Sequence, residues 1–169
     1  MDFQIDTADS LKVTDLEILE LLSRVYVDGG FVAPELAASL FESSAIRSRG
    51  KIVGAREKQS LKLAGMVIIV YPNSSARRLV QGNETEMQLL GVKPEYRGQS
   101  LGRMLVAAAM NDAKQGGFLK MLLSTQATMQ AAHGLYESSG FIRAPERDFN
   151  RGGRVFWAYE QDLSAAPTT

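Results

Sequence analysis

Apolar residues in the first part of the chain follow the period of a helix. The segment Thr14 to Glu17 has the spacing of a capping box, in which the Thr hydroxyl and the Glu carboxylate satisfy free backbone N–H groups at a helix start. Apolar side chains then share one helical face: Ile18, Leu22, Val25 and Tyr26. We expect Gly29-Gly30 to end this helix, and Pro34 to begin a second helix that runs towards Gly50. A short first strand is expected over 11–13.

Strand patterns dominate the next stretch. Lys51 to Arg56 and Leu63 to Tyr71 are separated by the polar segment 57–62, which predicts a hairpin with a longer loop. Met66 to Val70 is apolar on both faces, so we place it in the centre of a sheet.

The rest of the chain alternates between strands and helices. The predicted elements are, in order, a strand at Glu84–Val92, a helix at Leu101–Gln115, a strand at Phe118–Ser124, a helix at Thr128–Ser139 and a strand at Val155–Glu160. The two strands that flank the Leu101 helix should be parallel neighbours, and 146–153 reads as a polar loop. This order predicts an α/β or α+β fold with helices on both faces of a mixed sheet.

Composition narrows the class of protein. A chain of 169 residues suits one domain, and 45% apolar with 22% charged residues is ordinary for a globular protein. Nineteen basic and nineteen acidic side chains cancel, so a general affinity for nucleic acid or an anionic membrane is not expected. The acidic N-terminus lacks a signal-peptide pattern, which favours a cytoplasmic location. We expect one domain over 1–169, with a frayed tail at 164–169.

Two residue types are scarce in a way that limits the chemistry. Cysteine is absent, which excludes disulfides, thiolate zinc sites and a cysteine nucleophile. Because His133 is the single histidine, a multi-histidine metal site is excluded as well, and we expect no metal. On an amphipathic helix, this lone histidine is expected at the surface.

The segment Glu86 to Arg103 carries the clearest chemical pattern. It reads as a strand, a tight basic turn with glycines, and then a helix. Free N–H groups and the dipole at a helix start attract an anion, and Gly98 allows the backbone to approach a ligand closely. Arg97 and Arg103 can add charge-assisted hydrogen bonds to phosphate. The turn is therefore a candidate pyrophosphate site; the alternative is a plain loop with surface arginines.

Two blocks of this sequence resemble the GNAT acetyltransferase superfamily. The stretch Arg97-Gly98-Gln99-Ser100-Leu101-Gly102 is similar to its acyl-coenzyme A signature, Gln/Arg-x-x-Gly-x-Gly/Ala, with Ser100 at the position of the middle glycine. A second block, Ala132-x-x-Leu135-Tyr136-x-x-x-Gly140-Phe141, matches the helix after strand five of that family. The resemblance extends over about Thr85 to Ile142. We expect the Ser100 hydroxyl to donate a hydrogen bond to the phosphate.

The resemblance implies a fold, a co-substrate and a reaction. The fold would be a mostly antiparallel sheet of about seven strands, with strands four and five splayed to admit acetyl-CoA. Acetyl-CoA and an unidentified amine acceptor would be the partners, transfer would be direct, and a homodimer is common in the family. The pyrophosphate would lie on the turn formed by Arg97, Gly98, Gln99, Ser100, Leu101, Gly102 and Arg103. The pantetheine arm would pair like an added strand with Leu90, Gly91 and Val92.

Three residues are candidates for the catalytic roles. Attack by an amine requires loss of a proton, and Glu86 occupies the position where some GNAT enzymes place a carboxylate base, with Glu84 two residues away on the same side of a regular strand. Tyr136 matches the tyrosine that often protonates the departing thiolate. Alternatively, the glutamates are solvated strand ends and Tyr136 is a core aromatic. The loop 147–151, together with Tyr26 and Phe31, could line an acceptor pocket or simply pack.

Two other functions fit part of the same sequence. Gly98 to Gly102 matches the nucleophile elbow Gly-x-Ser-x-Gly, with Ser100 as nucleophile, Asp112 next in the chain and His133 as base. However, Asp112 falls on the helix that Ser100 opens, and residues 93–97 separate the motif from its strand, so a serine hydrolase is disfavoured. A GNAT-like domain that binds acyl-CoA without catalysing transfer is the third reading; Glu86 and Tyr136 argue against it.

Overall fold

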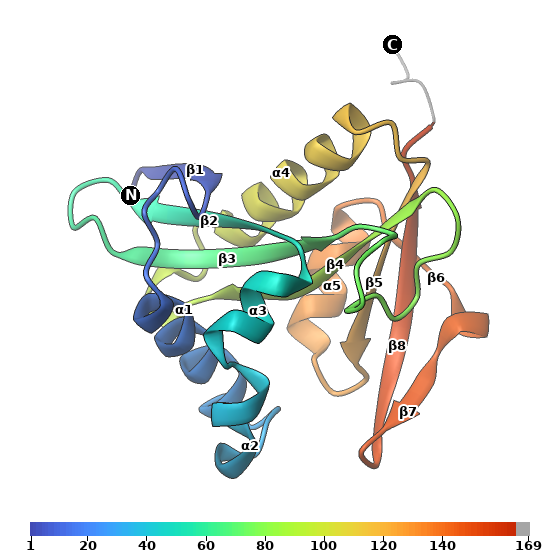
Figure 1. The fold of residues 1–169 in the computed structure, drawn as a ribbon, viewed down its shortest axis with the longest axis horizontal. Helices are drawn as coiled ribbons and strands as arrows, with labels where there is room; N and C mark the ends of the chain where they lie inside the picture. The colour runs from blue at the N-terminus through green and yellow to red at the C-terminus, as the bar shows by residue number, and fades with distance from the viewer. Residues whose placement is uncertain (165–169) are drawn as a thin grey trace.

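The structure, a computed structural model, describes residues 1–164 and contains one mixed sheet. Within these residues the strand order is β1-β2-β3-β4-β5-β8-β6, and β7 pairs with β8 (Figure 1). The strands are β1 (Phe3–Thr7), β2 (Lys51–Glu57), β3 (Leu63–Val70), β4 (Glu84–Val92), β5 (Lys120–Gln126), β6 (Ile142–Arg143), β7 (Phe149–Arg151) and β8 (Arg154–Asp162). The predicted α/β class and helix-flanked mixed sheet are confirmed. Apart from Ser164, the predicted tail lies outside the described residues.

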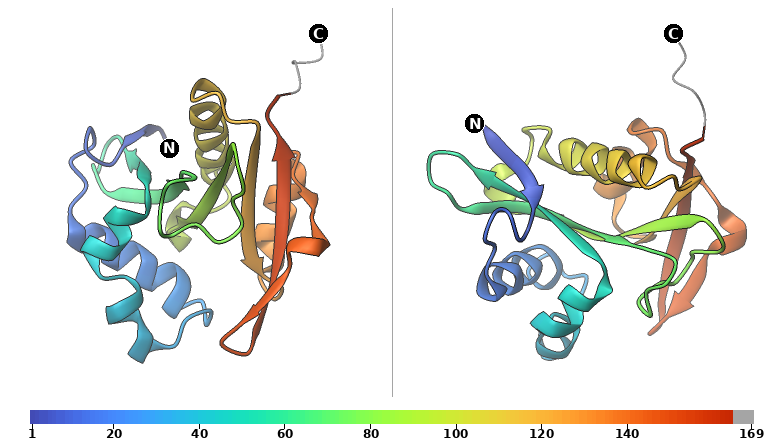
Figure 2. Two further views of the ribbon diagram at one scale, coloured as in Figure 1. Left: turned by 45° about the vertical axis from the view of Figure 1, so that its right-hand side comes forward. Right: turned by 45° about the horizontal axis from the view of Figure 1, so that its top comes forward.

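Helices cover both faces of this sheet (Figures 1 and 2). On one face, α4 (Leu101–Gln115) and α5 (Gln130–Ser138) enclose a core that contains Leu105, Met121 and Tyr159. On the other face, α1 (Asp15–Leu22), α2 (Pro34–Leu40) and α3 (Ser43–Arg49) cover a core built on Ile68 and Val70. All eight residues of β3 are buried, which confirms its predicted central position. No helix within 1–164 is both long and apolar enough to span a bilayer.

The first helix begins where the sequence predicts. Thr14 accepts a hydrogen bond from the Glu17 amide, the Glu17 carboxylate accepts one from the Thr14 amide, and both halves of the capping box are present. The helix continues from Ser23 to Val27 with π-helical hydrogen bonds. The predicted strand at 11–13 is wrong: the first strand is β1, because the alternating sequence Phe3 to Thr7 pairs with the free edge of β2.

The second predicted helix is two helices. Phe41 turns inward and is only 3% exposed, and the chain bends there between α2 and α3. The Glu42 carboxylate then caps α3 by accepting hydrogen bonds from the amides of Ser44 and Ala45. Pattern reading from Pro34 to Gly50 missed this break because burial of one aromatic side chain, not a Gly or Pro, causes it.

The end of the chain also contains more strand than predicted. The segment expected as a polar loop folds as β7 and a turn that pair with β8, from Phe149 opposite Phe156 to Arg151 opposite Arg154. These phenylalanines stack with their ring centroids 4.9 Å apart. Before β7 the chain forms a short 3₁₀ turn, η3, at Pro145–Arg147. A similar turn, η2, lies at Pro94–Tyr96 ahead of α4.

Strands β4 and β5 are parallel neighbours for only part of their length. Their pairing runs from Glu84 opposite Lys120 to Met87 opposite Leu123, and there it ends. Beyond this point the two strands diverge (Figure 1). Leu89 has φ 52, and the register between β3 and β4 shifts at the same level, so β4 bends away from β5 at a bulge. The parallel pairing and the splay both agree with the sequence expectations.

Candidate active site

The turn before α4 presents a row of backbone amides without partners. Within residues 1–164, the amides of Gly98 to Arg103 have no hydrogen-bond acceptor, and the first bonded amide is that of Met104, which donates to the Ser100 carbonyl at 3.0 Å. Six free N–H groups at the positive end of a 15-residue helix form an anion site. The geometry required of a pyrophosphate-binding turn is therefore present.

Ser100 has a left-handed backbone conformation, which explains why the acyl-coenzyme A signature has glycine at this position. Its φ is 62 and its ψ is 11, a left-handed conformation that a side chain disfavours. Although Ser100 is the N-cap of α4, its side chain forms no capping hydrogen bond. The exposed hydroxyl is therefore available to a ligand.

The two glycines of the turn serve different purposes. Gly98 has φ 74, and a Cβ placed there would meet no atom within 4 Å, so the space above it is open. A Cβ on Gly102 would lie 3.1 Å from Leu135 Cδ2, so this glycine allows α4 to approach α5. The neighbouring arginines reach protein groups: Arg97 Nε donates to the Val92 carbonyl at 3.2 Å, and Arg103 Nη2 to Ser138 Oγ at 3.2 Å.

The end of β4 is held from the opposite face by α1. Tyr26 donates its hydroxyl to the Leu90 carbonyl at 2.8 Å. A Cβ on Gly91 would lie 3.2 Å from both Leu21 Cδ2 and Val25 Cγ2, so a side chain there would crowd α1 and the π-helical turn that follows it. Leu90, Gly91 and Val92 thus line the splay on a strand end fixed by helix packing.

Tyr136 projects from α5 into the core beside the splay. It is 8% exposed and packs its ring edge-on against Phe141 and at a tilt against Tyr159. Its hydroxyl forms no hydrogen bond with any residue of the described range. Burial raises the pKa of Tyr136, so the phenol keeps its proton at neutral pH and can act as a donor.

Tyr26 approaches the same region from the other face of the sheet. Burial raises the pKa of Tyr26, and the proximity of Tyr136 raises it further. Sequence reasoning singled out Tyr26 as a pocket candidate, and the structure places its hydroxyl on the Leu90 carbonyl, beyond the point where β4 stops pairing with β5.

Glu86 lies at the site but is enclosed. It is 0% exposed, and its Oε2 accepts hydrogen bonds from the backbone amides of Arg78 (2.9 Å) and Leu79 (3.2 Å). Its Oε1 accepts one from Gln88 Nε2 at 3.2 Å. The alternative interpretation of Glu86 as a solvated strand end is therefore wrong. Glu86 instead anchors the segment 71–83, which crosses in front of the sheet (Figure 1).

Glu84 is engaged at the start of the same strand. Its two oxygens pair with Arg147, from Nη1 to Oε2 at 2.9 Å and from Nη2 to Oε1 at 3.1 Å, and Oε2 also accepts from the Gln81 amide. Burial acts to raise the pKa of Glu84, but the hydrogen bonds and charge of Arg147 outweigh it and leave that pKa below its usual range. A carboxylate held in this way is a weak base.

The structure does not assemble the hydrolase triad. Ser100 opens α4, whereas Asp112 lies near its other end and bonds to Lys51 and Tyr71. His133 is buried, not at the surface as expected: its ring stacks on Trp157 with centroids 4.9 Å apart, and Nε2 lies 3.1 Å from the Gln126 carbonyl. The stacking explains the burial, because β8 brings an aromatic face against α5.

A cavity of 460 Å³ opens between the segment 71–83 and the β7 region. Its lining residues are Arg78, Leu79, Gln81, Glu146, Arg147, Asp148, Phe149 and Arg151. Part of the loop that the sequence marked as a pocket candidate, 147–151, therefore does line a cavity. The opposite wall was missed, because Arg78 and Leu79 are brought here by Glu86 across a turn, and no local motif marks them.

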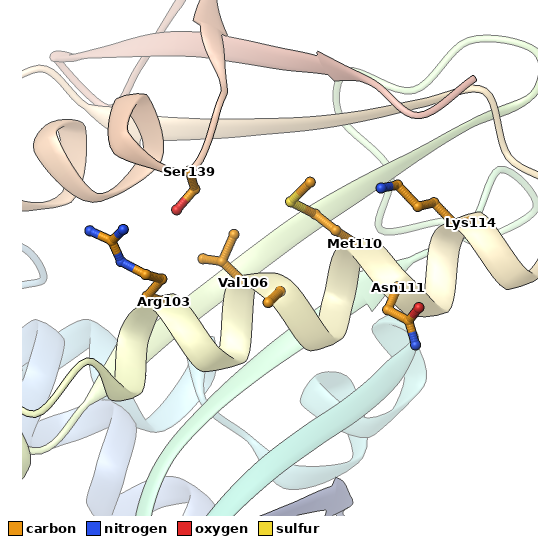
Figure 3. A pocket seen from close by; sticks show the side chains of 7 residues that line it. Arg103, Val106, Met110, Asn111, Lys114 and Ser139 are labelled. Carbon is orange, nitrogen blue, oxygen red and sulfur yellow. The ribbon is translucent and has the colours of Figure 1, made fainter. Parts of the chain in front are cut away.

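A second, smaller hollow of 270 Å³ lies between α4 and Ser139, which follows α5 (Figure 3). Its lining residues are Arg103, Val106, Ala107, Met110, Asn111, Lys114 and Ser139. Figure 3 shows Arg103 at the end nearest the start of α4 and Lys114 at the other end. This groove is separate from the 460 Å³ cavity and shares no residue with it.

The split sheet, with a glycine turn and helix at its mouth, is the architecture of GNAT acetyltransferases. A GNAT-family acetyltransferase from Staphylococcus aureus Mu50 superposes with a TM-score of 0.72 and 14% identity, covering 96% of this chain and 100% of that one. PaiA N-acetyltransferase from Thermoplasma acidophilum, solved in complex with coenzyme A, superposes with a TM-score of 0.68 and 19% identity, covering 96% and 99%.

Sequence comparison leads to the same family. Residues 16–141 match the acetyltransferase (GNAT) family, and the chain belongs to it. N-acetyltransferase family 8 member 3 from Rattus norvegicus is 31% identical over 120 residues, which are 71% of this chain and 43% of that protein. Mycothiol acetyltransferase from Kocuria rhizophila is 45% identical over 58 residues, 34% of this chain and 19% of that protein. The aligned parts thus span less than half of these relatives.

Proposed function

We propose that this protein is an N-acetyltransferase that transfers the acetyl group of acetyl-CoA directly to a primary amine. One observation carries the proposal: the six amides of Gly98 to Arg103 are free at the start of α4, after the strand β4 whose pairing with β5 ends at Met87. Membership of the GNAT family supports the same donor. The turn would hold the pyrophosphate, and Leu90 to Val92 would align the pantetheine arm.

The transfer requires one bond to form and one to break. The neutral amine nitrogen attacks the thioester carbon, and the C–S bond breaks as the tetrahedral intermediate collapses. Tyr136 gives its proton to the departing thiolate and regains one from solvent, while the product nitrogen loses a proton. Tyr136 is available for this role because its hydroxyl forms no hydrogen bond with any residue of the described range, and burial favours its protonated form.

The two glutamates act in our proposal as positioning residues. To serve as a direct base, Glu86 would have to lose three hydrogen bonds, and Glu84 would have to leave Arg147. Glu86 instead fixes the segment that carries Arg78, and Glu84 fixes η3 through Arg147. The amine then loses its proton to solvent, so the rate should rise with pH as the neutral amine becomes more abundant.

Thiol release from acetyl-CoA against a panel of primary amines tests this function. We expect amine-dependent release and saturable coenzyme binding by the wild type. Gly98→Val should weaken coenzyme binding at least about 10-fold, because its side chain enters the open space over the turn.

Gly117→Val is the matched control for that variant. Gly117 has φ 77, lies after the far end of α4 and also has open space around it, so its substitution carries a similar backbone strain. Equal loss of binding in both variants would contradict the phosphate turn. Coenzyme binding without release for every amine would overturn the transferase and favour a sensor domain.

A further inference from the structure

Three arginines without an acidic partner lie around the segment 71–83 and the cavity beside it. Five other arginines within residues 1–164 form ion pairs: Arg24 with Glu95, Arg47 with Asp15, Arg56 with Glu17, Arg143 with Asp148 and Arg147 with Glu84. Arg77, Arg97, Arg103 and Arg154 form none in the described range, and they do not line this cavity. Arg49, Arg78 and Arg151 have no carboxylate within 4.0 Å in the described range. These three come from α3, from the segment 71–83 and from β7.

Hydrogen bonds to side chains of β4 position two of these arginines, Arg49 and Arg78. Arg49 Nη1 donates to Gln88 Oε1 at 3.0 Å, and Gln88 is itself fixed by bonds from its Nε2 to the Ala76 carbonyl and to Glu86. The Arg78 amide donates to Glu86. The Glu86 oxygens therefore accept hydrogen bonds from two backbone amides and from Gln88. Within the described range, Glu86 forms no ion pair with the guanidinium group of Arg49 or Arg78.

Their charges act on one another. Burial lowers the pKa of Arg49, and the positive charge of Arg151 lowers it further. Loss of hydration likewise lowers the pKa of Arg78, with further lowering by Arg151 and Arg49. The charge of Glu86 acts in the opposite direction on both pKa values, and a bound anion would offset the remaining repulsion among the three arginines.

Two of the arginines line the cavity, and the third reaches the strand that forms one side of the splay. Arg78 and Arg151 line the 460 Å³ cavity. Arg49 donates to Gln88 of β4, two residues before Leu90, whose carbonyl accepts the hydrogen bond from Tyr26. Of the acidic residues that line the cavity, Asp148 is paired with Arg143, which leaves the exposed Glu146.

We propose that the acceptor amine carries an anionic group, a carboxylate or a phosphonate-like oxyanion, which Arg49, Arg78 and Arg151 bind while the amine points towards Tyr26 and Tyr136. Guanidinium groups suit this role because their paired N–H donors match such oxyanions. This inference rests on the proposed function and specifies its substrate class.

Amines that differ in the anion alone test the inference. Butylamine, γ-aminobutyrate and aminopropylphosphonate have similar chains and an unhindered primary amine; phenethylamine and L-phenylalanine form a larger pair. With saturating acetyl-CoA, we expect kcat/KM for the anionic members to exceed that of their neutral partners at least about 10-fold. The phosphonate arm tells which oxyanion fits better. Equal or better use of the neutral amines would overturn the inference.

Arg151→Gln should abolish this preference by raising KM for anionic amines at least about 10-fold, with little effect on neutral amines or on acetyl-CoA. Arg77→Gln is the control, because Arg77 is an exposed neighbour that donates to the Ser74 carbonyl and does not line the cavity. A KM unchanged in Arg151→Gln, or raised equally in Arg77→Gln, would contradict the assignment.

A binding measurement separates failure of this inference from failure of the proposed function. Titration of the coenzyme A-loaded protein with γ-aminobutyrate, L-phenylalanine and aminopropylphosphonate should show saturable binding that Arg151→Gln weakens. Absence of binding for all three would overturn the anionic acceptor, whereas turnover of neutral amines would still uphold the transferase. Absence of coenzyme binding would overturn the proposed function itself.

Discussion

Ser100 shows how one residue can depart from a family pattern without losing the geometry behind it. A left-handed conformation costs a non-glycine residue about 1–2 kcal/mol relative to the right-handed helix, yet Ser100 adopts it at φ 62. The turn keeps its row of free amides, so the conformation is preserved and only the side chain is added. The Ser100 hydroxyl forms no capping hydrogen bond, so a hydrogen bond from it to a phosphate would offset the free-energy cost of this conformation.

Tyr136→Phe should lower kcat about 100-fold or more and leave KM for acetyl-CoA nearly unchanged, because the phenol acts on the departing thiolate and not on the bound coenzyme. Steady-state kinetics with a good amine acceptor check this. Tyr159→Phe is the control: it removes a neighbouring phenol that donates to Glu137, and it should retain turnover. A similar kcat in the wild type and Tyr136→Phe would exclude the general-acid role.

At the scale of elements, two features position α1 on the sheet: its apolar face and an ion pair made by its first turn. Glu17 belongs to the capping box and also pairs with Arg56 of β2, at 2.6 Å from Nη1 to Oε1. The hydrogen bond from Arg56 is the largest of the effects that lower the pKa of Glu17 from 4.5 to about 2. The same residue therefore starts the helix and ties it to the sheet, which sets where Tyr26 meets β4.

This pair predicts a specific dependence of stability on pH. Because the pKa of Glu17 is lower in the folded protein, its charged form stabilises the fold above pH 4.5, and that contribution is lost as the pH falls towards about 2. Urea unfolding should show the wild type more stable than Glu17→Gln near neutral pH, with a difference that shrinks across this window. Arg56→Met should remove most of the same pH dependence. A difference that stays constant from neutral pH down to about 2 would refute the coupling.

At the scale of the whole molecule, the sheet is divided at the β4–β5 splay. The part before it carries α1 to α3, and the part after it carries α5 and β6 to β8. Gln126 spans the two parts, because its Nε2 donates to the Phe31 carbonyl at 2.9 Å and its Oε1 accepts from Arg154 at 2.8 Å. A coenzyme seated in the splay would add a second bridge between them.

Acetyl-CoA should therefore raise the thermal unfolding temperature of the wild type. A ligand at 100 times its dissociation constant stabilises a protein by about 2.7 kcal/mol, enough for a shift of several degrees. Differential scanning fluorimetry checks this, with pantetheine as a control that lacks the phosphates and should give a smaller shift. An undiminished shift in Gly98→Val would contradict binding at the turn. The homodimer and the cytoplasmic location stay predictions.

Sequence reading succeeded where local energetics decide the structure. The capping box at Thr14, the central strand β3 and the bounds of β4 and α4 agree with the pattern, because capping, side-chain period and glycine turns act over a few residues. The glycine turn proposed to bind phosphate was predicted from the sequence for the same reason. Its free amides follow from the start of a helix, which the chain specifies within seven residues, Arg97 to Arg103.

Only the tertiary structure decided which candidate side chains are accessible and which are already engaged in hydrogen bonds or packing. Nothing near Glu86 in the sequence shows that the amides of Arg78 and Leu79 enclose it, and nothing near His133 shows that Trp157 covers it. The arginine group joins residues 49, 78 and 151, which are separated by long stretches of chain. Such contacts depend on how the sheet brings distant segments together. Local patterns therefore determined the glycine turn, whereas only the tertiary structure placed these three arginines around one region.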